Sequence, residues 1–343
     1  MPFRAVLAGC GAMSKGWLEA LASPGLKDRV AVVGLIDVDR AAAERRAAER
    51  GLAGIAIGTD LGDLLSETNA DIVFDVVPPS ARRAVVETGL AHGCHVLSEK
   101  PMAMSLEDAR AMLAAAETAG RLHAIVQNRR FNTGVRRIRA TIESGVLGTL
   151  NAVHSDFFVG AHFGGFREVM EHVLLLDMAI HTFDAARFMS GKEPLAVYCH
   201  ETNPASSWYA GGSVANAIFE FSDDVLFTYR GSWSAEGANT SWDAAWRIVG
   251  SRGTLLWDGE EAFTARIVDG AEGFLRPLRE VAVPPPADAE ETHGHRSVIG
   301  DFLTAIESGR RPETDSRDNI ESLAMVLAAT ESAAKRQRVH ITP

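Results

Sequence analysis

The sequence is poor in cysteine, which argues against a disulfide-stapled secreted protein. Its three cysteines, Cys10, Cys94 and Cys199, lie far apart, are odd in number and have no metal-ligand spacing. The N-terminal MPFR leads into AVLAG without a long apolar core, so we expect no signal peptide. We therefore expect reduced thiols and a cytoplasmic location.

An excess of positive charge and long apolar runs are also missing. The 343 residues carry 34 Lys and Arg against 45 Asp and Glu, a net charge of −11. No basic stripe offsets this charge, so nucleic acid is not an expected partner. The longest apolar runs fall well short of a bilayer span, so we expect no membrane partner. What is present is 46% hydrophobic residues in a chain long enough for two domains.

Short apolar runs alternate with helical stretches in the first third of the chain. This alternation predicts parallel strands joined by right-handed crossovers, which form a doubly wound Rossmann sheet. The strands are expected at residues 4–9, 30–37, 71–77, 95–99 and 123–128.

The pattern changes near Asn128. Alternation with a period of two predicts a mostly antiparallel sheet, interrupted by one helical segment at 174–191. We therefore predict an α/β protein with a Rossmann domain over 1–126. An α+β domain over 127–343, with a large open sheet, would bind substrate and form oligomers. Helices from about residue 296 are expected to pack back toward the Rossmann domain.

A glycine-rich turn follows the first expected strand. Gly9 would allow the tight turn and Gly11 would let the backbone approach a pyrophosphate, which the next helix N-terminus favours. Ser14 occupies the place of the third glycine, and a small residue there still permits close helix–strand packing. The turn therefore predicts dinucleotide binding.

Asp37 ends the second expected strand. A carboxylate there can accept both ribose hydroxyls of adenosine and would repel a 2′-phosphate, which favours NAD. It could instead cap the next helix, a role that Asp39 could fill equally well. Arg40 could meet a 2′-phosphate or stack on adenine, so NADP stays possible.

Four motifs together resemble one known family. The segments GCGAM (9–13), VVPPSAR (76–82), SEKP (98–101) and LLLDMAIHTFDAARF (174–188) are similar to those of the glucose–fructose oxidoreductase, inositol dehydrogenase and rhizopine-catabolism (Gfo/Idh/MocA) family. The resemblance covers nearly the whole chain. It implies a nicotinamide-dependent oxidoreductase acting on sugars, cyclitols and related polyols, and dimers or tetramers formed through the C-terminal sheet.

The resemblance also implies roles for individual residues. It makes Lys100, Asp177 and His181 the catalytic set, with Lys100 beside the nicotinamide and the reacting oxygen. Further substrate contacts are expected from Asn128, Arg129 and His172. The coenzyme would meet Gly9, Gly11, Ala12, Met13, Asp37, Arg40, Val77, Pro78, Pro79, Glu99, Lys100 and Asn128.

Two positions depart from the family pattern. Arg82 and Trp17 stand where many members have a histidine. These departures leave the expected chemistry in place. They mean that the substrate of any one relative should not be assigned to this chain.

Elementary chemistry supports the same catalytic set. Asp177 and His181 are four residues apart and would share a face of a helix. A carboxylate stabilises the protonated imidazole, whereas a nearby lysine disfavours it. The histidine could then exchange a proton near neutral pH while Lys100 holds the alcohol oxygen.

Other histidines and aromatic residues have less specific patterns. His154, His162, His172, His293 and His295 could suggest a metal site, but we expect none. The two histidines of ETHGHRS (291–297) lie on an expected loop, and the nearest carboxylates have no firm geometric relation to them. His172 could line the substrate pocket or pack a loop. Trp208, Tyr209, Trp233, Trp242 and Trp246 could stack on a sugar or belong to a core. The apolar face of VANAIFEF (214–221) would be buried by a second subunit or by the domain's own helices, and we favour a homodimer or homotetramer.

The expected function is therefore hydride transfer between nicotinamide and a secondary alcohol or carbonyl of a sugar, inositol or related polyol. The alternative is an NAD-dependent glycosidase that uses transient oxidation and elimination, as the family resemblance allows. A dinucleotide sensor without enzymatic activity would not need the proton-transfer residues.

Overall fold

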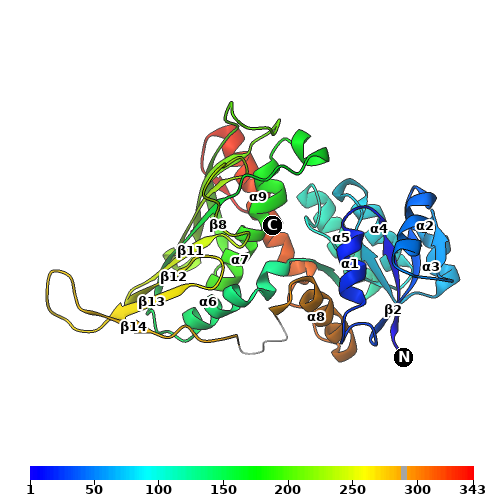
Figure 1. Cartoon of the computed structure of the whole chain (residues 1–343), viewed down its shortest axis with the longest axis horizontal. Helices are drawn as coiled ribbons and strands as arrows, with labels where there is room; N and C mark the ends of the chain where they lie inside the picture. The colour runs from blue at the N-terminus through cyan, green and yellow to red at the C-terminus, as the bar shows by residue number, and fades with distance from the viewer. Residues whose placement is uncertain (287–291) are drawn as a thin grey trace. The chain divides into compact units, whose positions relative to one another are not determined.

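The computed structural model describes residues 1–286 and 292–343. Contacts divide the chain into two compact units (Figure 1). The first unit contains Met1–Asn128 and His293–Leu323, and the second contains Arg129–Thr292 and Ala324–Pro343. Each unit is described separately below.

The first unit is built on a six-stranded sheet in the order β3-β2-β1-β4-β5-β6, and every strand pair in it is parallel. This order is that of a Rossmann fold, so the predicted doubly wound sheet is confirmed. The strands are β1 (Phe3–Ala8), β2 (Val30–Ile36), β3 (Ala56–Gly58), β4 (Ile72–Asp75), β5 (His95–Ser98) and β6 (His123–Ile125). The helices between them are α1 (Ser14–Leu21), α2 (Arg40–Glu49), α3 (Leu61–Thr68), α4 (Pro79–Ala91) and α5 (Leu106–Ala119).

Continuous apolar runs form the central strands of this sheet. All four residues of β4 are buried, as are the last four of β1. Strands with helices on both faces need apolar side chains on both faces, which is why these runs do not alternate. Strand β3 was not predicted, because three residues are too few to show a pattern.

The chain returns to the first unit near its end. Helix α8 (His295–Ser308) packs against α1, and Arg29 pairs with Glu307 of α8 at 2.8 Å. Helix α9 (Ser316–Lys335) begins in the first unit, but from Ala324 onward it belongs to the second. The first unit thus contains α8 and the first part of α9.

The second unit contains a nine-stranded sheet in the order β14-β13-β12-β11-β7-β10-β9-β8-β15. Its strand pairs are antiparallel except β10 with β7, which is parallel, so the predicted mostly antiparallel sheet is confirmed. The strands are β7 (Leu150–Phe158), β8 (Pro194–Thr202), β9 (Val214–Phe221), β10 (Leu226–Ser232), β11 (Ala245–Gly250), β12 (Gly253–Trp257), β13 (Phe263–Val268), β14 (Leu278–Val281) and β15 (Val339–His340).

The apolar face of this sheet is covered by the unit's own helix α7 (Ile180–Ser190). The ring centroid of Phe183 in α7 lies 4.7 Å from that of Phe219 in β9 and 5.2 Å from that of Tyr229 in β10. All three side chains are buried. The alternation of β9 is thus explained by intramolecular packing, and it carries no argument for a second subunit.

The segment before α7 departs from the single α-helix expected at 174–191. Residues Leu174–Ala179 form a π-helix, η3, and α7 begins only at Ile180. Asp177 therefore lies in a wider turn than His181 does. Such turns are rare and are often found at functional sites. A periodic apolar pattern predicts a helix but does not distinguish these two forms.

The remaining helical segments of the described residues comprise one α-helix and three short 3₁₀ segments. They are η1 (Asn128–Phe131), α6 (Thr133–Glu143), η2 (Gly165–Val169) and η4 (Ser222–Asp224). Within the described ranges, no helix has the length and apolar character needed to cross a membrane.

Candidate active site

The glycine turn of the first unit has the geometry that a dinucleotide requires. Gly9 has a φ of +95°, and a Cβ there would lie 2.7 Å from the carbonyl of Val76, so a larger residue would be strained. At Gly11 a Cβ would meet nothing within 4 Å, which leaves open space over the backbone. The Ser14 hydroxyl donates to the Gly11 carbonyl at 2.7 Å and fixes the start of α1. Ala12 and Met13, just before α1, are exposed.

A hollow of about 610 Å³ lies beside this turn. Asp37 is at its wall, where its carboxylate accepts hydrogen bonds from the amides of Cys10 at 2.7 Å and Asp39 at 3.0 Å. The cap of α2 is Asp39, which accepts from the amide of Ala41, so Asp37 is not needed as a cap.

The lining of this hollow is acidic. Asp37 and Asp60 contribute carboxylates, and Lys and Arg are absent among the described residues that line it. Arg40 points elsewhere, since it bonds to Glu44 at 3.0 Å and to the carbonyl of Ile57 at 2.9 Å. Val77 and Pro78 also line the hollow, whereas Pro79 is the first residue of α4.

Lys100 follows β5 and is joined to Pro101 by a cis peptide bond. The preceding Glu99 is 7% exposed and accepts several hydrogen bonds. The indole of Trp17 donates to its Oε1 at 2.8 Å, His295 Nε2 lies 3.3 Å from the same oxygen, and the Lys100 amide donates to Oε2 at 3.1 Å. Burial alone would raise the pKa of Glu99, but His295, Trp17 and the charge of Lys100 together lower it.

The other side of the Lys100 loop is held by Arg82. Its guanidinium is 1% exposed and pairs with the fully buried Asp75 at 2.8 Å. It also donates to the carbonyl of Val77 at 2.8 Å and to the carbonyl of Pro101. Burial raises the pKa of Asp75 although Arg82 opposes the rise. The two departures from the family pattern, Trp17 and Arg82, thus supply donors to the residues that flank Lys100.

Asn128 also lies in this group. Its Nδ2 is 3.4 Å from Nδ1 of His295, and its Oδ1 is buried without a hydrogen-bond partner among the described residues. The predicted residues Glu99, Lys100 and Asn128 are therefore joined through a histidine that had no predicted role beyond a rejected metal site.

In the second unit, Asp177 is paired with an arginine that was not predicted. Arg167, in η2, donates to its carboxylate at 2.5 Å. The guanidinium lies over the rings of Phe163 at 4.9 Å and Phe166 at 4.8 Å. Since Asp177 is largely buried, this contact fixes the orientation of its carboxylate.

His181 lines a small hollow of the same unit with Arg129, Trp242 and Asp243. Arg129 contacts the carboxylate of Asp243, which also accepts from the side-chain amide of Asn132 at 2.7 Å. The structure thus places the predicted residues His181 and Arg129 at one hollow.

His172 is held by the sheet. Its Nδ1 lies 2.5 Å from Glu201 of β8, and this contact raises the pKa of His172. The ring is partly exposed, so the choice between a substrate contact and loop packing stays open.

Three other histidines considered as metal ligands contact different polar groups, and His295 contacts Asn128 as well as Glu99. His154 contacts Thr228 at 2.6 Å, His162 contacts Glu236 at 2.8 Å, and His295 contacts Glu99. Across the described ranges, 1–286 and 292–343, no group of three or more potential ligands converges.

The five aromatic residues considered for sugar stacking separate by burial. Tyr209, Trp233 and Trp246 are buried, whereas Trp242 is 48% exposed and lines the His181 hollow. The ring of Trp208 stacks on His162 at 3.7 Å. Trp242 is thus the most exposed of the five at the edge of the His181 hollow.

Two family models match the chain along most of its length. Residues 3–127 match an oxidoreductase family with an NAD-binding Rossmann fold, and residues 135–256 match the Gfo/Idh/MocA C-terminal domain. The chain belongs to the Gfo/Idh/MocA family. The predicted family, the oxidoreductase class and the coenzyme NAD are confirmed.

Individual members of the Gfo/Idh/MocA family show the same extent of similarity. The chain is 27% identical to D-apiose dehydrogenase of Paraburkholderia graminis, over 99% of this chain and 90% of that protein. It is 25% identical to inositol 2-dehydrogenase of Rhizobium meliloti, over 99% and 100%. A crystal structure of an oxidoreductase from Agrobacterium radiobacter, in complex with NAD+, L-tartaric acid and magnesium, has a TM-score of 0.85, 22% identity and 99% coverage of both chains.

Sequence reasoning missed several polar residues around the predicted site. Arg167, Asp75 and the contact of His295 with Glu99 have no local motif. His295 is separated from Glu99 by 196 positions, so only the fold reveals the contact. The sequence shows that Arg167 and His295 are polar residues, but it does not indicate which side chains they contact.

Proposed function

We propose that the protein is an NAD-dependent dehydrogenase or reductase that acts on a secondary alcohol or carbonyl of a sugar, inositol or related polyol. The proposal rests on one observation above others: the Lys100 loop of this oxidoreductase is held on both sides by buried polar contacts. Relatives named D-apiose dehydrogenase and inositol 2-dehydrogenase support the substrate class.

The first unit fits the coenzyme. Gly9 and Gly11 leave room for a pyrophosphate at the N-terminus of α1, and the acidic hollow at Asp37 suits an unmodified adenosine ribose. We therefore propose a preference for NAD over NADP. When bound, the nicotinamide would accept or supply the hydride.

Side chains of the protein would transfer the proton that accompanies the hydride. In this proposal Lys100 donates a hydrogen bond to the reacting oxygen, and His181 takes the proton during oxidation or returns it during reduction. Asp177, whose carboxylate is fixed by Arg167, would stabilise the protonated imidazole of His181. Asn128, Arg129 and His172 are proposed to contact substrate, and Glu99 is proposed to shape the Lys100 loop.

A substrate panel tests this function. Sugars, inositols and aryl glycosides are each incubated with NAD, while absorbance of the reduced nicotinamide and release of free sugar are followed together. A dehydrogenase forms NADH and oxidised product in equal amounts. Sugar release from a glycoside without net NADH would instead establish the alternative glycosidase reaction.

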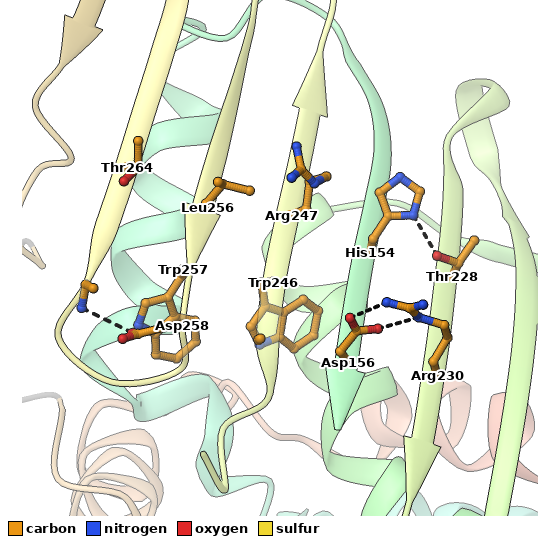
Figure 2. A pocket seen from close by; sticks show the side chains of 12 residues that line it. His154, Asp156, Thr228, Arg230, Trp246, Arg247, Leu256, Trp257, Asp258 and Thr264 are labelled. Carbon is orange, nitrogen blue, oxygen red and sulfur yellow. Dashed lines mark hydrogen bonds and ion pairs between the residues drawn. The ribbon is translucent and has the colours of Figure 1, made fainter. Parts of the chain in front are cut away.

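We also propose a homo-oligomer formed through the outer face of the C-terminal sheet. On this face Tyr198 and Ile218 are paired across β8 and β9 and are 43% and 49% exposed. Neighbouring strands β7 and β10 carry the Asp156–Arg230 ion pair beside a hollow of about 670 Å³ (Figure 2). Sedimentation of the wild type and of Ile218→Asp would test this proposal, because a charge at the interface should shift the protein toward monomer.

The cysteines support a reducing compartment. Cys10, Cys94 and Cys199 are unpaired and buried, and burial raises the pKa of each thiol to about 11 or 12. We propose a cytoplasmic location on this basis.

A further inference from the structure

His295 lies at the N-terminus of α8 and contacts the residue before Lys100. Its Nε2 is 3.3 Å from Glu99 Oε1, and its ring is T-shaped against Trp17 at 6.0 Å between centroids. The Glu99 side chain is 9% exposed, whereas that of His295 is 29% exposed. Trp17, the other donor to the same oxygen of Glu99, is fully buried, so His295 is the more accessible of the two donors.

The second ring nitrogen fixes the tautomer of His295. The nitrogen of the Asn128 side chain carries only donor hydrogens, so Nδ1 of His295 must be the acceptor in the 3.4 Å contact between them. The proton of the neutral ring then resides on Nε2, which points at Glu99. Asn128, His295 and Glu99 thus form a chain of hydrogen bonds that ends at the backbone of Lys100.

A buried carboxylate that loses a hydrogen-bond donor attracts another donor or a positive charge. Lys100 is one candidate, because it is the next residue, its amide already donates to Glu99 Oε2 at 3.1 Å and its charge contributes to lowering the pKa of Glu99. An ammonium drawn onto Glu99 cannot hold a substrate oxygen. The hydrogen bonds of Trp17 and His295 to Glu99 reduce the attraction of this carboxylate for the Lys100 ammonium.

We propose that His295 is a positioning residue of the redox site, which satisfies Glu99 so that the Lys100 ammonium is directed to substrate. This inference rests on the proposed function of Lys100. It assigns a role to a residue outside both family models, which end at residues 127 and 256.

Two polar substitutions provide the test. In His295→Gln the amide nitrogen can reach the place of Nε2, whereas in His295→Asn it stops near the place of Nδ1 and cannot reach Glu99. We expect kcat to fall roughly 10- to 100-fold in His295→Asn, the scale of a small misplacement of a catalytic group, and to stay within about threefold of wild type in His295→Gln. The dissociation constant of NAD should stay within about threefold in both. His293→Asn, on the same segment but exposed, is the matched control and should match wild type.

A second readout needs no turnover. The chain has five lysines, so reductive ¹³C-methylation gives few resonances, and the Lys100 signal is assigned by its absence in Lys100→Met. In His295→Asn that signal should move, and in His295→Gln and His293→Asn it should not. Equal kcat in His295→Asn and wild type, or an unmoved Lys100 signal, would overturn the proposal. Lack of turnover by the wild type on the whole substrate panel would instead count against the proposed function, and the Lys100 signal would still decide the contact.

Discussion

Around Lys100 the polar side chains are almost wholly buried, whereas around Asp177 several neighbours are open to solvent. Arg82 and Glu99 are 1% and 7% exposed, and each makes more than one hydrogen bond. Near Asp177, Phe166 is 64% exposed and Val169 is 75% exposed. Arg167, between them, joins Asp177 to this surface.

The difference separates two tasks within one enzyme. A buried, fully bonded frame suits the part that must hold a reacting group to a fraction of an ångström. Exposed side chains on short 3₁₀ segments can change without loss of the core, which suits a surface that meets different substrates. We infer that the buried contacts of the first unit fix the position of Lys100 and that the 163–169 segment adapts the specificity.

The largest expected effect on stability comes from breaking the buried ion pair of Arg82 with Asp75. Arg82→Leu leaves the carboxylate of Asp75 buried and unpaired, so the free energy of unfolding should fall by about 3–5 kcal/mol. Arg83→Leu removes two exposed ion pairs one residue away and should lower the free energy of unfolding far less, because water screens them. Urea unfolding of both variants measures the difference, and equal losses would show that Asp75 does not depend on Arg82.

Sequence reasoning succeeded where the signal was local. Alternating apolar runs predicted the strands of the first sheet, and the glycine turn predicted its nucleotide site. It could not show that Trp17, Arg82 and His295 converge on the Lys100 loop, because these residues are brought together by tertiary packing. The parallel pairing of β10 with β7 and the π-helix at Asp177 also leave no mark on the apolar period.

A second test concerns the coenzyme hollow. Asp37→Ser removes one of the two carboxylates that line it, so affinity for NADP should rise relative to NAD by about 10- to 100-fold, on the scale of one lost charge repulsion. Calorimetric titration of both coenzymes with wild type and variant gives this ratio. Asp39→Ser, which changes the cap of α2, is the control and should leave the ratio unchanged. Tighter NADP than NAD binding by the wild type would contradict the assignment of Asp37.

Two histidines should make opposite contributions to the pH dependence of the free energy of unfolding. Burial, and then the charge of Arg82, lower the pKa of His123 in the first unit to about 3, while Glu201 raises the pKa of His172 in the second. Between pH 6.5 and 3 the unfolded chain binds a proton that native His123 does not, so the free energy of unfolding falls as pH drops, by at most about 1.4 kcal/mol per pH unit. The stability from His172 is present below pH 6.5 and is lost as pH rises through its raised pKa.

Urea unfolding across pH in matched variants separates these contributions. His123→Gln should flatten the acid side of the profile, and His172→Gln should flatten the side above pH 6.5. His293→Gln, at an exposed position, should leave both sides unchanged. An acid side unaffected by His123→Gln would mean that this histidine is not buried in its neutral form.

The smallest effect on stability is expected at the exposed segment. Phe166→Ala should change the free energy of unfolding by less than about 0.5 kcal/mol, because most of the ring is already in water. The Michaelis constant for substrate should nevertheless rise several-fold while kcat stays close to wild type, because the Arg167 guanidinium loses its contact with the Phe166 ring. Phe274→Ala, at a fully exposed position, should change neither quantity. A loss confined to kcat would contradict a role in specificity.

The central claim is that Lys100 and His181 serve one proton transfer, and a double-mutant cycle on kcat tests it most directly. Lys100→Met and His181→Ala should each lower kcat by about 10²–10⁴-fold while NAD affinity changes far less. If the two groups act as a unit, the double variant should be little slower than the slower single variant. Near-normal turnover in either single variant, or losses that multiply in the double variant, would contradict the account.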